Sequence, residues 1–166
     1  MKPEDLEYFN RFLREFQEET DRGAALVGAA LLDQQLLDLL SSHLLDKKQS
    51  RELLQGGTAP LGTFSARIKA SYCLGLLTDL EHRELQLIRK VRNEFAHHVH
   101  GLAFQTERIS GLCSQFYDRM PDAEEKEIER SVRTRYIDAV IFNSLALWYR
   151  PQHALKFKAE QQNWPY

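Results

Sequence analysis

The stretch RGAALVGAALLDQQLLDLLSSHLL, residues 22–45, decides the fold. Its leucines and alanines recur every three or four residues, the spacing that places side chains on one face of an α-helix. Small residues fill its first part and let a neighbouring helix approach closely. We therefore predict a long central helix over residues 22–45, with Thr20 or Asp21 as the N-cap.

The same spacing continues on both sides of this helix. Upstream, an apolar stripe from Leu6 to Phe16 predicts a first helix. Downstream, Thr78 and Glu81 have the spacing of a capping box, and Gly101, Pro121 and Pro151 are expected to end helices. The helices predicted downstream cover residues 49–55, 64–77, 80–100, 107–119 and 123–149.

No stretch alternates polar and β-branched residues as a strand does, so the prediction is an all-α, single-domain helical bundle. The domain is expected over residues 1–150 and a C-terminal tail over residues 151–166. The core is expected to contain Ala24 to Ala30, Ile68 to Leu76 and Leu85 to Phe95.

Composition narrows the function classes. Hydrophobic residues make up 43% of the 166 residues, charged residues 28%, and the net charge is −2. The slightly negative net charge gives no overall attraction to nucleic acid, and no basic recognition helix is present, so we expect no direct specific DNA binding.

The N-terminus lacks a signal peptide, and the apolar stretch Gly23 to Leu32 is too short to span a bilayer, which predicts a cytoplasmic protein without a membrane partner. Cys73 and Cys113 are expected to be reduced and buried.

Motifs for cofactors and metals are missing from the sequence. It contains no glycine-rich phosphate-binding motif, no zinc spacing of cysteine and histidine, and no His-Glu-x-x-His. His97, His98 and His100 cluster, and a histidine pair with one intervening residue can bind a metal, but no cysteine accompanies them. We expect neither a cofactor nor a metal.

The segment LIRKVRNEFAHH, residues 87–98, carries the residues best suited to chemistry. Asn93 and His97 are four residues apart and share a helix face, which the side chain of Arg92 can reach. An arginine can stabilise charge on a phosphate, and a histidine can transfer protons near neutral pH. The three side chains are the minimal parts of a metal-free site for RNA cleavage.

A structural interpretation of the same residues stays open. Arg92 could pair with an acid such as Asp33 inside the bundle, and His97 could cap carbonyl groups at the helix end, where cations complement the helix dipole. The discriminating observation is whether Arg92 and His97 are exposed together or buried with partners.

RNEFAH, residues 92–97, resembles the Arg-Asn-x-x-x-His signature of the HEPN superfamily of helical bundles, many of which are metal-independent RNases. The resemblance implies a homodimer in which the motif helices of two protomers face each other. It assigns Arg92, Asn93 and His97 as catalytic residues.

A longer resemblance, over about residues 8–120, is to the mannitol operon repressor (MltR-like) family. It rests on TDRGAALVGAALLD at 20–33, APLGTFSARIK at 59–69 and LGLL at 74–77. This resemblance implies an all-helical regulator that acts through protein partners. The second element also has a structural interpretation, in which Arg67 is buried against Asp33 or Glu94.

Three functions follow from these observations. The first is an MltR-like regulatory protein that acts through protein–protein interaction, for which the resemblance alone implies a role in transcriptional regulation. The second is a HEPN-like RNase of a toxin or defence system, with RNA as its substrate, and the third is a non-catalytic dimerisation module. A homodimer is expected because the last helix, with Tyr136, Phe142, Trp148 and Tyr149, has more apolar surface than one stripe needs.

Overall fold

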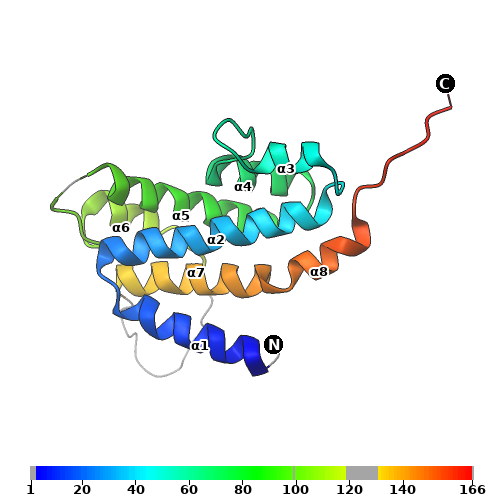
Figure 1. The fold of residues 1–166 in the computed structure, drawn as a ribbon. Coiled ribbons are helices and arrows are strands. Elements are labelled where there is room, and N and C mark those ends of the chain that lie inside the picture. Colours follow the sequence, from blue (N-terminus) through cyan, green and yellow to red (C-terminus); the bar gives the residue numbers. More distant parts are fainter. Residues whose placement is uncertain (1–2, 99, 119–130, 166) are drawn as a thin grey trace. The chain divides into compact units, whose positions relative to one another are not determined.

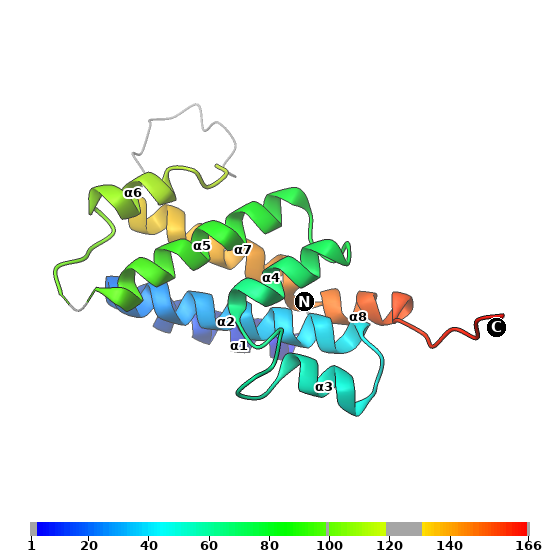
Figure 2. The same ribbon diagram turned by 90° about the horizontal axis from the view of Figure 1, so that it is seen from above.

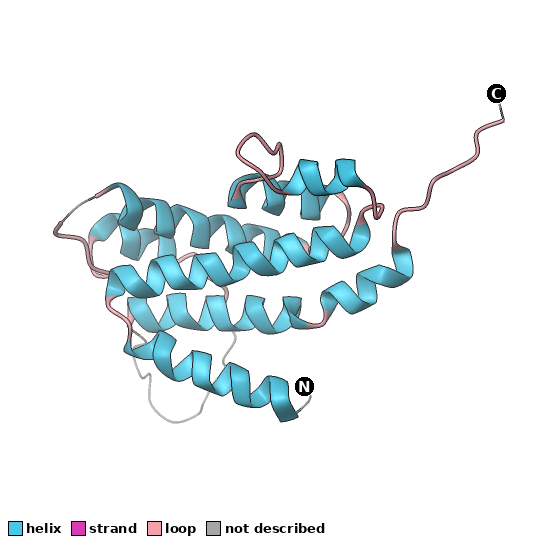
Figure 3. Ribbon diagram, in the orientation of Figure 1, coloured by secondary structure: helices cyan, strands magenta, loops and turns pink. Residues whose placement is uncertain are grey.

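The structure is a computed structural model that describes residues 3–98, 100–118 and 131–165. Every regular element within these residues is a helix, as Figure 3 shows, so the all-α prediction is confirmed. The elements, labelled in Figure 1, are α1 (Pro3–Glu18), α2 (Asp21–His43), α3 (Lys48–Leu54), α4 (Phe64–Cys73), α5 (Asp79–His97), α6 (Glu107–Cys113), α7 (Val132–Trp148), α8 (Arg150–Ala154) and the 3-10 helix η1 (Leu155–Phe157).

The chain forms two compact units, and each is assembled from segments far apart in the sequence. The first unit contains Met1–Ala30 and Leu87–Ile141, and the second contains Leu31–Gln86 and Phe142–Tyr166. Residues of α2, α5 and α7 therefore belong partly to one unit and partly to the other. The predicted boundary between a domain at 1–150 and a tail at 151–166 stays a prediction.

The core of the first unit is rich in aromatic side chains. The ring of Phe104 packs edge-on against Phe95 at 5.3 Å and lies 5.1 Å from Tyr136, and all three side chains are fully buried. Gly28 lies where an added Cβ would come within 3.0 Å of Val140 and 3.1 Å of Phe16. The small residues at the start of α2 therefore do allow close packing, as the sequence predicted.

Asp21 ties three segments of the first unit together at the start of α2. Its carboxylate accepts hydrogen bonds from the backbone N–H of Phe104 (3.0 Å) and from Arg133 (2.9 Å). The Arg133 guanidinium also donates to the carbonyls of Gln17 and Glu19, near the end of α1. Thr20, rather than Asp21, caps α2, because its hydroxyl accepts from the Gly23 N–H.

Arg67 organises the second unit. Its side chain is almost buried and donates to the Asp33 carboxylate (2.8 Å) and to the carbonyls of Leu54 (3.2 Å) and Leu61 (3.1 Å). It thereby pins the loop between α3 and α4 onto α2. The predicted pairing of Arg67 with Asp33 is confirmed, and the element APLGTFSARIK has a structural role.

The predicted capping box at the start of α5 is also present. The Thr78 N–H donates to Glu81 (2.8 Å), and the Glu81 N–H donates to the Thr78 hydroxyl (3.3 Å). Arg150 adds two bonds to the Glu81 carboxylate, at 2.7 and 2.6 Å. Burial alone would raise the pKa of Glu81, but the bonds from Arg150 and Thr78 outweigh it and hold the pKa below its usual value.

The predicted end of α4 is wrong. The helix from Phe64 stops at Cys73 and not at residue 77, because Gly75 adopts a φ of +70° and the N–H of Leu76 bonds back to Ser71. Leu76 therefore lies outside the helix. The last long helix, α7, ends at Trp148, one residue before its predicted end at Tyr149, and Pro151 lies in the first turn of the next helix, α8, where a proline is tolerated.

Two other helices begin or end inside the predicted ranges. The helix from Glu107 ends at Cys113, and the last long helix begins, within the described residues, at Val132. The predictions on residues 119–130, including the stop at Pro121, lie outside the described residues.

Cys113 is buried as expected, whereas the prediction for Cys73 is wrong, because this side chain is exposed at the end of α4. Among the described helices, α2 is long and apolar enough to cross a membrane by length and composition alone. Of its most apolar window, 56% is buried inside the protein, as in the core helix of a globular fold. The sequence estimate, based on Gly23 to Leu32, underestimated the length of this apolar segment.

Candidate functional site

Arg92, Asn93 and His97 lie on the part of α5 that belongs to the first unit, and none of the three is buried. Arg92 and His97 are five residues apart, which separates them by about 140° around the helix axis. The opposite side of the helix is anchored by Ile88, Val91 and Phe95, which are fully buried. Arg92 and His97 are exposed and Asn93 is half-buried. The Arg92 guanidinium donates to the Asn93 side-chain carbonyl at 3.2 Å, so the sequence prediction that these side chains share one region is confirmed for this pair.

Among the described residues, neither of the two contacts that the structural interpretation named is found. Asp33 pairs with Arg67 and belongs to the second unit, while Arg92 is exposed. The imidazole that contacts a carbonyl at the end of α5 is His98, whose Nδ1 lies 2.9 Å from the Glu94 carbonyl oxygen. His97 is the last residue of α5 and faces solvent.

The end of α5 is held from three directions. Arg22 of α2 donates to the carbonyl of His98, just after the helix. Arg108 of α6 forms an ion pair with Glu94 at 2.8 Å. The aromatic contact of Phe95 with Phe104 fixes the buried side. The backbone that carries Arg92, Asn93 and His97 is therefore firmly placed.

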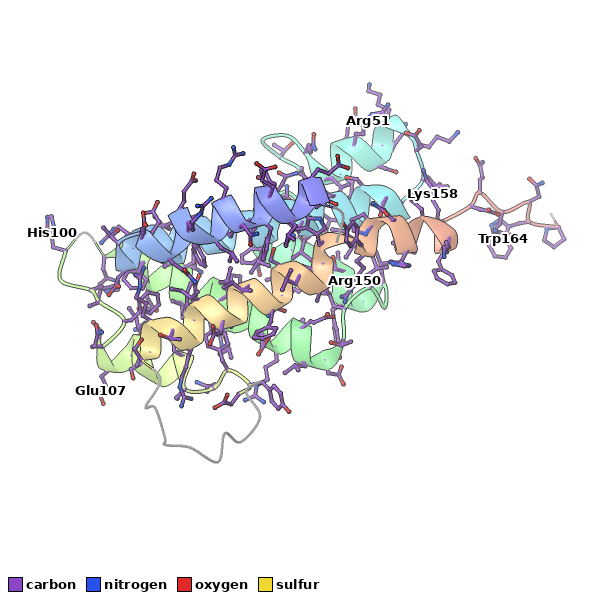
Figure 4. The ribbon with its side chains drawn as sticks, turned by 90° about the horizontal axis from the view of Figure 1, so that it is seen from below. Arg51, His100, Glu107, Arg150, Lys158 and Trp164 are labelled. Atoms are coloured by element: carbon purple, nitrogen blue, oxygen red, sulfur yellow. The ribbon has the colours of Figure 1, made fainter. Side chains whose placement is uncertain are left out.

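The sequence analysis missed Arg22 and Arg108 in this role. Arg22 is 76 residues away from its partner His98 in the chain, and Arg108 lies beyond the loop after α5. Figure 4 labels His100, in the connection from α5 to α6, and Glu107, the first residue of α6. No local pattern marks such long-range pairs; only the position of Arg22 at the start of a helix gave a weak signal.

Positive charge dominates this region. Residues 87–108 contain four permanent cations, Arg89, Lys90, Arg92 and Arg108, and only two acids, Glu94 and Glu107. The same range contains three histidines, at 97, 98 and 100. Within the described part of the chain, no group of three or more His, Cys, Asp or Glu residues could hold a metal ion. A permanent cation, an amide and an exposed imidazole can bind an anionic group and move a proton beside it.

The fold of this chain is similar to that of MtlR. In the X-ray structure of the MtlR–HPr complex from Escherichia coli, one chain aligns with 88% of this chain and 97% of its own length, at a TM-score of 0.55 and 24% sequence identity. At this identity the likeness establishes the fold. No family model matches the sequence, and no curated protein matches it.

The apolar surface expected on the last helix is only partly exposed. Tyr136 is buried, and its hydroxyl donates to the carbonyl of Ala25, so it offers no contact surface. Phe142 and Leu145 are exposed, at 40% and 39%, whereas Trp148 and Tyr149 are half-buried. Trp164, labelled in Figure 4, is exposed in the tail.

Proposed function

We propose that this chain is a regulatory protein that acts by binding another protein. The observation that carries the proposal is the similarity of its fold to MtlR, over 88% of this chain, in a structure where MtlR is in complex with HPr. The resemblance of residues 20–33, 59–69 and 74–77 to the MltR-like family supports the same conclusion from the sequence.

Titration calorimetry of the purified chain with purified HPr tests this proposal. We expect saturable binding with a fixed stoichiometry. An absence of heat and of co-elution in gel filtration, with both proteins folded by circular dichroism, would contradict HPr as the partner.

We further propose that any effect of this chain on transcription is indirect, through a protein partner and not through binding of the chain to an operator. The net charge is −2 and the sequence offers no recognition helix, so few phosphates can be neutralised on an operator. A mobility-shift assay with promoter fragments at physiological salt should give no specific complex with the purified chain alone. A salt-resistant, sequence-specific complex would argue for direct operator binding.

A homodimer is also part of the proposal. Exposed Phe142 and Leu145, three residues apart on α7, give an apolar strip that a second copy would cover. Light scattering at micromolar concentration should give twice the mass of the chain. Replacing both residues by Ser should yield a folded monomer, and an unchanged mass would exclude this strip as the interface.

A metal-independent RNase is a second candidate, favoured by the exposure of both Arg92 and His97 on α5. In this proposal His97 either accepts the proton of the attacking 2′-hydroxyl or donates a proton to the leaving oxygen. Arg92 stabilises the negative charge that builds up at phosphorus in the transition state. Cleavage of generic RNA should persist in EDTA, and His97→Ala should lower its rate by about 100- to 10,000-fold. Arg92→Ala should be comparably damaging, and Arg92→Lys should restore only part of the rate.

Thermal melting separates this candidate from a structural role. Because both side chains are exposed, His97→Ala and Arg92→Ala should leave the melting temperature unchanged. A clear drop in melting temperature, together with no RNase activity in the wild type, would show that Arg92 and His97 stabilise the fold and would contradict the RNase candidate. It would favour the third function, a non-catalytic dimerisation module.

A further inference from the structure

In the first unit, α5 and the neighbouring α6 carry exposed basic side chains. We call Lys90, Arg92, His97 and Arg108 the cationic face. Lys90, Arg92 and His97 are exposed, and the side chain of Arg108 is 74% exposed. Within the described residues, neither Lys90 nor Arg92 is paired with a carboxylate, whereas the whole chain has a net charge of −2.

The positions of Lys90, Asn93 and His97 follow from helix geometry, whereas Arg92 leaves the helix about 160° away from Lys90 and is turned towards Asn93 by their hydrogen bond. Lys90 and His97 are seven residues apart, which places them two turns, or about 10 Å, apart along one side of the helix. Asn93 lies between them on the same side, and its carbonyl holds Arg92 at 3.2 Å. Figure 2 shows α5 and α6 beside each other in the first unit, where Arg108 reaches Glu94.

The backbone under the cationic face is already fixed before any partner binds. Arg22 holds the carbonyl that follows α5, Arg108 holds Glu94, and Phe95 is packed on Phe104. A partner therefore loses little binding energy to ordering this helix.

The chemistry of the face favours an acidic protein surface over RNA. Single-stranded RNA is held by aromatic side chains that stack on bases as well as by cations. The aromatic residue within residues 87–98 is Phe95, and it is fully buried. Separate cations on a rigid helix suit a surface of Asp and Glu side chains, which needs no stacking partner.

We propose that the cationic face is the docking surface for an acidic patch on the partner protein. The inference rests on the proposed function, because it names the surface by which this chain binds that partner. Association should be fast at low salt and should weaken as salt screens the charges.

The test uses the double variant Lys90→Glu/Arg92→Glu and a matched control, Lys48→Glu/Arg51→Glu. The control has the same change in charge on α3, where both side chains are well exposed. Fluorescence anisotropy measures binding of a labelled peptide of Asp, Glu and Ser, and of a single-stranded RNA of the same formal charge. Calorimetry measures binding of HPr.

We expect wild type and control to bind the acidic peptide alike, and the α5 variant to bind it at least about tenfold more weakly. Equal binding by the α5 variant and the control would overturn the proposal. So would an α5-dependent affinity for RNA without affinity for the peptide, which would assign the face to nucleic acid.

The HPr titrations separate this inference from the function on which it rests. HPr binding that survives in the α5 variant overturns the docking face and leaves the proposed function standing. Peptide binding that depends on α5, with no HPr binding by wild type, supports the face and contradicts HPr as the partner. Circular dichroism of every variant confirms that each one is folded.

Discussion

Replacing Arg67 by Ala should destabilise the protein more than any other removal of a single charge on α4. Three acceptors lose their donor at once: the carbonyls of Leu54 and Leu61 and the Asp33 carboxylate. A buried carbonyl without a donor costs about 1–3 kcal/mol. The Asp33 side chain is 30% exposed and can regain part of its hydration. We therefore expect a loss of about 3–5 kcal/mol, the range found when one partner of a buried pair is removed.

Urea unfolding followed by circular dichroism measures this loss. Arg67→Lys should cost about half as much, because an ammonium keeps the charge but cannot reach three acceptors in different directions. Arg108→Ala is the matched control, since its ion pair with Glu94 is exposed on the arginine side and should contribute less than about 1 kcal/mol. If Arg67→Ala and Arg108→Ala unfolded at the same urea concentration, the reasoning on the Arg67 contacts would be refuted.

Three further predictions concern other contacts. Because Arg150 and Thr78 hold the pKa of Glu81 below its usual value of 4.5, the stabilisation from this carboxylate should be complete above pH 4.5 and lost as the pH falls through the lowered pKa. In Arg150→Gln, carbon NMR should show the Glu81 pKa rising, since burial then dominates; an unchanged titration would contradict this. Burial raises the pKa of Cys113 to about 12, despite the opposing charge of Arg135, so a thiol reagent should modify Cys73 alone in the folded protein and both cysteines in urea. Gly28→Val should cost about 1–3 kcal/mol because its side chain would meet Phe16 and Val140, whereas Gly57→Val, in open space, should cost much less; equal melting temperatures would count against the close packing.

Periodicity and capping signals predicted most of the helices. The apolar stripe from Leu6 to Phe16 became α1, and residues 22–45 became α2 with nearly the same ends. The capping box at Thr78 and Glu81 was predicted because both of its bonds connect residues three apart. Such local signals depend only on the chain near them, and so one sequence is sufficient to find them.

The errors arose where distant residues decide the outcome. Gly75 ends α4 through a left-handed turn, and the apolar residues that follow it, Leu76 and Leu77, hid that signal by continuing the helical spacing. Asp33 has two arginine candidates in the sequence, and only the packing of the second unit shows that Arg67 is its partner. The exposure of Arg92 and His97 follows from which side of α5 the core covers, which the motif alone does not specify.

The composition of the two units has a consequence for how the chain folds during its synthesis. The carbonyls of Gln17 and Glu19 receive their hydrogen bonds from Arg133, which the ribosome adds more than a hundred residues later. The first unit must therefore wait for residues 87–141, and the second for residues after 141. Until then the buried aromatic face of α1 has no complete core to join. A nascent chain of this protein should thus depend more on chaperones, and tolerate premature termination less, than a chain whose units are continuous in sequence.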